Sequence, residues 1–238
     1  MIFDPMYFII LAPALLLAMW AQFRVKSAYH KAAQIPARSG VTGAQAAMQI
    51  LRRAGVDNVG IEPAQGFLSD HYDPRHKVLR LSPDVYGGRS LAALGIAAHE
   101  AGHAIQDRVR YAPLVVRNAV VPIAGFGSNL AMILFMIGIV LSTATASASG
   151  SPLGTTLIWG AILLYSAVVF FQLVNLPVEF NASSRARDVL METGLITADE
   201  APEVRRVLSA AALTYVAATL TAILTLVYFI LRAQQSQR

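Results

Sequence analysis

Residues 118–178, NAVVPIAGFGSNLAMILFMIGIVLSTATASASGSPLGTTLIWGAILLYSAVVFFQLVNLPV, contain no charged side chain over 61 positions. An ordinary soluble domain does not contain such a stretch, because roughly 25% of its residues are charged. In the whole chain only 14% of residues are charged and 55% are hydrophobic. The segment 142–156, rich in Ser, Thr and Gly, interrupts the stretch near its middle. The stretch therefore predicts two membrane-spanning helices joined by a short turn.

Two further stretches have no charge, residues 6–23 and residues 207–231. A helix needs about 20 apolar residues to cross a bilayer, so both are candidate spans. A cleaved signal peptide is the alternative for the first, but its beginning, MIFDPMYF, has an acid where a basic region is expected. The sequence thus predicts a mainly α-helical membrane protein with four transmembrane helices, at 5–23, 118–141, 154–175 and 208–231.

Basic residues beside the spans predict the orientation of the chain. They concentrate in residues 24–117 and 176–207, which the positive-inside rule places in the cytoplasm. Both termini and the 142–156 turn are then outside, although Arg232 and Arg238 count against this. The pI near 9.7 fits anchoring to anionic lipid, and no basic patch interleaved with aromatic residues suggests a nucleic-acid partner.

The sequence predicts a small α+β region in the first cytoplasmic segment, 24–117. A Thr42/Gln45 capping box opens a helix that stops at Gly55. Short strands are expected at VGIE (59–62) and KVLRLS (77–82), with a turn-rich stretch between them, and a helix at 90–107. In the second segment we expect a helix that begins after Pro177. A second helix, opened by a Thr197/Glu200 capping box, leads into the last span.

The helix at 90–107 contains the motif AAHEAGHAIQD (97–107). His99 and His103 lie one turn apart, about 6 Å along the axis, so both imidazoles can reach one metal ion. Glu100 points about 100° away from His99 and can take a proton from the attacking water. Ala101 and Gly102 leave room for another segment to pack closely. The alternative is a solvated helix with two unrelated histidines.

A catalytic zinc site needs a third protein ligand, and the chain has no cysteine. The remaining candidates are His30, His71, His76 and the carboxylates. Glu179 is favoured because it is the first charge after the apolar hairpin, which returns the chain to the membrane face that it left. Its alternative role is that of a first-turn glutamate favoured by the helix dipole.

For two further groups of residues, the sequence allows more than one role. Asp70, His71 and Asp73 could bind a second cation, or they could cap a turn. The candidates for stabilising the oxyanion of a hydrolytic reaction are Arg185, Arg187, His71 and Tyr215.

FLSDHYDPRHKVLRLSPDVYGGRSLAALGIAAHEAGHAIQD (67–107), followed by LPVEFNASSRARDVL (176–190), resembles the YugP-type neutral zinc metallopeptidases of bacterial membranes. The resemblance covers nearly the whole chain, and the layout is similar to that of the HtpX/Ste24 group of membrane gluzincins. It implies that His99, His103 and Glu179 bind one catalytic Zn²⁺ and that Glu100 is the general base.

The chain departs from the HtpX group at one position. In that group the third ligand begins an E-x-x-x-D pattern, whereas here the stretch reads EFNAS and Ser183 replaces the aspartate. The orientation of a ligand histidine by that carboxylate is therefore in question. Asn181 and Asp188 are the candidate substitutes.

These features predict a membrane zinc metalloendopeptidase that acts on membrane-associated or misfolded proteins. KVLRLS is a candidate edge strand for binding extended peptide, or else a strand that only packs on the motif helix. Two other functions stay open: a site-2-type intramembrane protease, and a non-catalytic metal-binding scaffold or chaperone. Two histidines and a carboxylate favour zinc, and suit iron or manganese less well.

Overall fold

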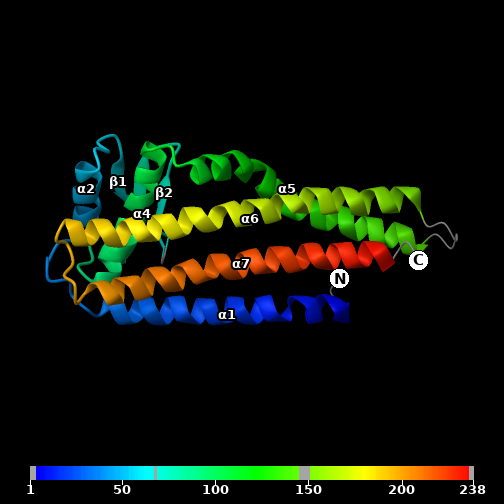
Figure 1. Ribbon diagram of the computed structural model, residues 1–238, viewed down its shortest axis with the longest axis horizontal. Coiled ribbons are helices and arrows are strands. Elements are labelled where there is room, and N and C mark those ends of the chain that lie inside the picture. The colour runs from blue at the N-terminus through cyan, green and yellow to red at the C-terminus, as the bar shows by residue number, and fades with distance from the viewer. Residues whose placement is uncertain (1–3, 67–68, 145–150, 236–238) are drawn as a thin grey trace. The chain divides into compact units, whose positions relative to one another are not determined.

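The computed structural model describes residues 4–66, 69–144 and 151–235 and divides the chain into two compact units. We call residues 1–19, 116–175 and 215–238 the apolar unit, and residues 20–115 and 176–214 the mixed unit. Four helices are long and apolar enough to cross a membrane (Figure 1). This confirms the four candidate spanning helices. They are α1 (Pro5–Ala33), α5 (Ala112–Ala144), α6 (Pro152–Glu192) and α7 (Ala201–Gln235).

All four helices are longer than the spans predicted from charge-free sequence. Helix α1 continues from the predicted end at residue 23 to Ala33, and α6 continues through Pro177 to Glu192. The residues after Pro177 are helical, as predicted, but they continue the spanning helix and do not begin a new one. A proline removes one helical hydrogen bond, and a long helix tolerates this where neighbouring groups compensate for it. The predicted 142–156 turn is too long: residues 142–144 belong to α5 and residues 152–156 to α6, and residues 145–150 lie outside the described residues.

Aromatic rings form the centre of the apolar unit. Phe135 and Phe229 are fully buried and stack with centroids 3.9 Å apart, and Tyr165 lies 5.2 Å from Phe229. Large apolar side chains on the same helices are instead exposed: Phe126 is 82% exposed and Leu163 76%. Such exposure is costly in water but not against lipid.

One ion pair in the apolar unit bears on the predicted orientation. Asp4 lies 3.1 Å from Nε of Arg232 and accepts a hydrogen bond of 2.8 Å from the Tyr228 hydroxyl. Arg232, which counts against placing the C-terminus outside, is therefore neutralised within the chain.

A three-stranded sheet lies in the mixed unit, in the order β1-β3-β2. Strand β1 (Gly60–Pro63) is parallel to β3 (Val78–Leu81), and β2 (His71–Asp73) is antiparallel to it. The strands β1 and β3 were predicted. Strand β2 was not, because it is a three-residue strand inside the stretch that was expected to form turns.

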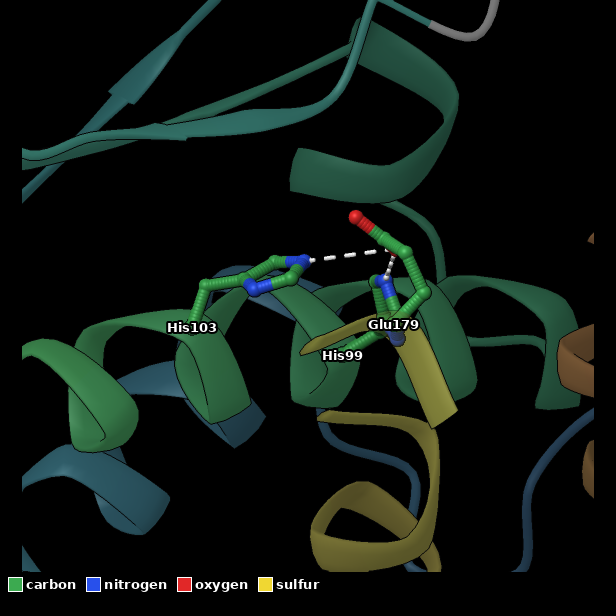
Figure 2. Close-up of side chains that lie close together, drawn as sticks. All are labelled: His99, His103 and Glu179. Carbon is green, nitrogen blue, oxygen red and sulfur yellow. Dashed lines mark ion pairs between the residues drawn. The ribbon is translucent and has the colours of Figure 1, made fainter. Parts of the chain in front are cut away.

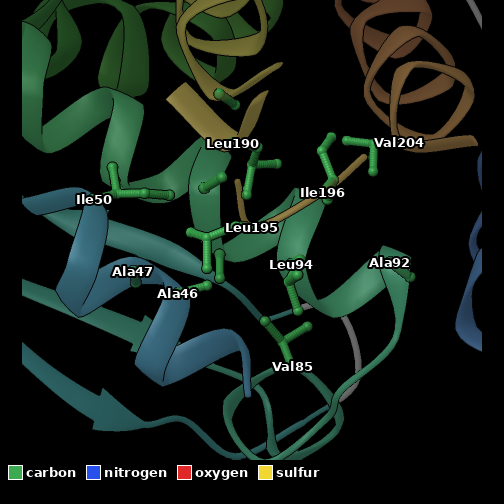
Figure 3. Packing of buried hydrophobic residues seen from close by; sticks show 14 of the residues in the cluster. Ala46, Ala47, Ile50, Val85, Ala92, Leu94, Leu190, Leu195, Ile196 and Val204 are labelled. Atoms are coloured by element: carbon green, nitrogen blue, oxygen red, sulfur yellow. The ribbon is translucent and has the colours of Figure 1, made fainter. Parts of the chain in front are cut away.

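Helix α4 (Leu91–Arg108) passes through the core of the mixed unit. Ser90 caps it, and small residues on several of its faces are fully buried because they allow close packing on all sides. Helix α2 (Gly43–Arg53), whose predicted Thr42/Gln45 capping box is present, packs on α4 together with the short helix α3 (Pro83–Tyr86). Figure 3 shows labelled residues of this core from α2, α3, α4, α6, the connection between α6 and α7, and α7: Ala46, Ala47, Ile50, Val85, Ala92, Leu94, Leu190, Leu195, Ile196 and Val204.

Glu200 fixes the turn before α7. Its carboxylate accepts hydrogen bonds from the Thr197 amide and hydroxyl, at 2.8 and 3.0 Å, and from the Arg38 amide at 2.8 Å. The predicted pair of Thr197 and Glu200 is therefore in contact, and the helix itself begins at Ala201.

Candidate metal centre

Helix α4 presents two histidines on one face. His99 and His103 are one turn apart, half-buried, and have ring centroids 4.8 Å apart with ring planes nearly perpendicular. Figure 2 shows both imidazoles directed toward Glu179. The i and i+4 spacing places the rings side by side, as the sequence predicted.

Glu179 completes the group from α6. Its Oε2 atom lies 3.3 Å from Nε2 of His99 and 3.6 Å from Nε2 of His103. One ligand atom of each residue lies within 4.8 Å of the others, and no other residue that the structure describes joins the group. Glu179 is only 3% exposed, so solvent does little to stabilise its charge.

The close approach of α6 to α4 depends on Gly102. A Cβ atom at this position would lie 2.9 Å from the backbone oxygen of Ala182 on α6. The sequence predicted that Ala101 and Gly102 would admit another segment here, and α6 is that segment. Because Ala182 follows Glu179 by three residues, this contact also sets how near Glu179 lies to the histidines.

The distances fit a zinc ion. Bonds of about 2.0–2.1 Å at tetrahedral angles separate the ligand atoms by about 3.4 Å. The two nitrogen-to-oxygen distances, 3.3 and 3.6 Å, are close to that value. Moreover, Oε2 of Glu179 is buried and accepts no hydrogen bond from any described residue. A buried carboxylate oxygen without a donor fits a group that binds a cation.

Gln106 determines which nitrogen of His103 faces Glu179. Its amide nitrogen donates to the backbone oxygen of Val178 at 2.8 Å and to Oδ1 of Asn181 at 3.0 Å. Its amide oxygen therefore faces Nδ1 of His103, at 3.0 Å. Nδ1 must then carry the proton, which leaves Nε2 to face Glu179 and a metal.

Ser183 is the corresponding partner of His99, with its Oγ atom 3.3 Å from Nδ1. The residue that replaces the aspartate of the HtpX pattern thus still lies beside a ligand histidine. Asn181 instead binds Gln106 and Arg185, and Asp188 lies 3.4 Å from Ser184. The sequence analysis missed Gln106, although its position three residues after His103 on α4 was a usable signal.

Glu100 lies on α4 beside the edge strand β2. One oxygen of its carboxylate accepts a hydrogen bond of 3.0 Å from the backbone amide of Tyr72. The Tyr72 hydroxyl donates to Asp107 at 2.6 Å, so α4 holds β2 at two points. Of the two roles left open for KVLRLS, that of an edge strand is excluded, because its residues 78–81 pair with β1 on one side and β2 on the other.

Residues 7–234 match the family described as "Putative neutral zinc metallopeptidase". The chain belongs to this family. It is 46% identical, over 95% of its length and 96% of the relative's, to a Bacillus subtilis (strain 168) protein named "Putative membrane protease YugP". No solved structure gives a significant match.

Membership of a zinc metallopeptidase family implies zinc. The charges around His99, His103 and Glu179 also favour a cation. Burial by itself lowers the pKa of His103, but the neighbouring carboxylates of Glu179 and Glu100 outweigh it and leave the pKa raised. The pocket therefore favours positive charge at this position, which either a proton or a metal ion supplies.

The other histidines do not join this group. His30 lines a separate cavity with Asp84 and Arg89, His71 contacts the backbone oxygen of Ser69 through Nδ1, and His76 pairs with Asp73 at 2.7 Å.

In the SDHYD stretch, Asp73 caps the turn that follows it, whereas Asp70 binds Ser82 twelve residues along the chain. Asp70 accepts from the amide and hydroxyl of Ser82, and Asp73 accepts from the amides of Arg75 and His76 and from the Arg80 guanidinium. The contacts of its carboxylate with the His76 ring and the Arg80 guanidinium hold the pKa of Asp73 well below its usual range. The structure thus favours the capped turn over a second cation site.

The candidates for oxyanion stabilisation are not brought together. Arg185 donates to Asn181 at 2.7 Å, and Arg187 lines a cavity between α1, α6 and α7. Tyr215 belongs to the apolar unit, whereas the other three belong to the mixed unit.

Proposed function

We propose that this chain is a membrane-embedded zinc metalloendopeptidase in which His99, His103 and Glu179 hold one Zn²⁺ and Glu100 is the general base. One observation carries the proposal: two imidazole nitrogens and a buried, donor-free carboxylate oxygen lie within 4.8 Å of one another. Membership of the zinc metallopeptidase family supports the same ligand chemistry. Bound there, zinc would polarise the scissile carbonyl and acidify the attacking water.

The protein's own groups have distinct roles in this proposal. Glu100 takes a proton from the attacking water and delivers it to the leaving amine. The Tyr72 amide holds one oxygen of the Glu100 carboxylate, which orients the base. Gln106 and Ser183 keep the histidines in position through their Nδ1 atoms.

An extended peptide would add beside β2, since β3 is paired on both sides. Strand addition gives affinity through main-chain hydrogen bonds and so suits substrates of varied sequence. We propose that these substrates are membrane-associated or misfolded proteins. The site would lie on the cytoplasmic face of the bacterial inner membrane, as the distribution of Arg and Lys favours.

The test compares the wild-type chain with Glu100→Gln on an unfolded casein-like substrate, at equal protein and zinc content. We expect the variant to keep its zinc and to lose at least about 100-fold in rate, the size typical of a missing general base. The matched control is Glu192→Gln, which makes the same change at an exposed position at the end of α6 and should cleave normally.

Each alternative function predicts a different result. A metal-binding scaffold or chaperone would show no cleavage in any of the three proteins, and equal cleavage by the wild type and Glu100→Gln would refute the role of Glu100. A site-2-type protease would cut within a transmembrane segment. The 18-residue length of α4 and its charges at Glu100, Asp107 and Arg108 disfavour that reading, because they do not suit a spanning helix.

A further inference from the structure

A cavity lies in the mixed unit, and none of the three candidate ligands lines it. Its volume is about 590 Å³, in the range of small-ligand sites, and its walls come from α1, α6, α7 and the turn before α7. Its polar lining residues are Arg24, Arg187, Arg205, Arg206, Asp188 and Ser209. The candidate metal centre does not use any of these residues.

The charge of this cavity is unbalanced. Four guanidinium groups line it against one carboxylate, that of Asp188. Only Arg206 has an ion-pair partner, Glu203, among the described residues. Arg24 stacks over Trp20 at 5.3 Å, Arg187 contacts Ser184 at 3.4 Å, and Arg205 forms no hydrogen bond or ion pair with any residue that the structure describes. Guanidinium groups that line the same cavity repel one another unless an anion lies between them.

Three of the four arginines lie at the ends of apolar stretches. Arg24 directly follows the charge-free residues 6–23 on α1, and Arg205 and Arg206 directly precede the charge-free residues 207–231 on α7. Trp20, on which Arg24 stacks, is 50% exposed, and tryptophan is enriched at the headgroup level of bilayers. On helices that span, these residues therefore occur where phosphate headgroups begin.

We propose that this cavity binds a phosphate-bearing anion through Arg24, Arg187, Arg205 and Arg206. Guanidinium groups bind phosphate oxygens in pairs, and several of them around one cavity favour a phosphate with net negative charge over a zwitterionic headgroup, whose phosphate is neutralised by its own ammonium group. The phosphate belongs to an anionic lipid or to a free phosphate, which present the same oxygens to the arginines. The site is independent of peptide hydrolysis, so failure of the proposed peptidase activity would leave it intact.

The experiment uses the full chain in a neutral detergent. Binding of tail-labelled phosphatidylglycerol is followed by fluorescence anisotropy, with unlabelled phosphatidylcholine as the zwitterionic competitor, and binding of inorganic phosphate by calorimetry. We expect saturable binding that phosphatidylcholine does not displace and that weakens about tenfold or more in Arg187→Gln/Arg205→Gln, because two charge-assisted contacts are lost. The matched control, Arg52→Gln/Arg53→Gln, changes the same charge at exposed positions of α2 and should bind as the wild type does.

The outcomes separate the sources of the phosphate. Arginine-dependent binding of phosphatidylglycerol identifies a lipid headgroup, and arginine-dependent binding of inorganic phosphate without the lipid identifies a free phosphate. If neither probe binds, or if the double variant and the control bind equally, the proposal is overturned. Should the double variant misfold, the single variants Arg24→Gln and Arg205→Gln give the same test at exposed positions.

Discussion

Gln106 acts on the candidate metal centre through its hydrogen bonds. It is fully buried, and its amide links Val178 and Asn181 of α6 to Nδ1 of His103. Groups that orient a metal-ligating histidine in this way typically contribute 10–100-fold in metal affinity. Its contact with His103, at 3.0 Å, is also shorter than that of Ser183 with His99, at 3.3 Å.

We therefore expect Gln106→Leu to weaken zinc binding by roughly 10–100-fold, because Nδ1 of His103 loses its acceptor. Competition with a chromogenic chelator measures this affinity. The control is Gln34→Leu, which makes the same change at an exposed position after α1 and should not alter it. Unchanged affinity in Gln106→Leu would show that the tautomer of His103 does not depend on this amide.

At the scale of elements, the packing of α6 on α4 positions the third candidate ligand. We expect Gly102→Ala to destabilise the protein by about 1–3 kcal/mol and to lower its zinc content, because the new Cβ would meet the backbone oxygen of Ala182 at 2.9 Å. Thermal unfolding in detergent and metal analysis provide the two measurements. Gly160→Ala on α6 is the control, since a Cβ there meets no atom within 4 Å. Equal behaviour of both variants would contradict a tight contact between the helices.

The elements that were predicted correctly have signals that are local in the sequence. The i and i+4 histidines, the Thr42/Gln45 capping box and the charge-free stretches each depend on neighbours in one helix. Strand β2 was missed because three residues beside Pro74 give no period, and its place depends on pairing with β3. Gln106 was missed because its partners Val178 and Asn181 are more than 70 positions away.

For the whole molecule, the distribution of Arg and Lys predicts the side of the membrane on which each segment lies. The chain has no cysteine, so single cysteines can report this directly. In intact cells we expect a membrane-impermeant maleimide to label Ser151→Cys, within the predicted outer turn, and not Arg52→Cys, on the exposed surface of α2. Both should be labelled after the membrane is opened. The reverse pattern in intact cells would place the mixed unit, and with it the candidate metal centre, outside.

The central claim is that α4 and α6 together build one zinc site, and metal analysis of the purified chain tests it most directly. We expect about one zinc per wild-type chain, a folded Glu179→Ala variant with little or none, and full occupancy in Glu192→Ala, the exposed control on the same helix. Circular dichroism establishes that all three proteins are folded. Unchanged zinc in Glu179→Ala would contradict the account, since the buried carboxylate would then not be a ligand.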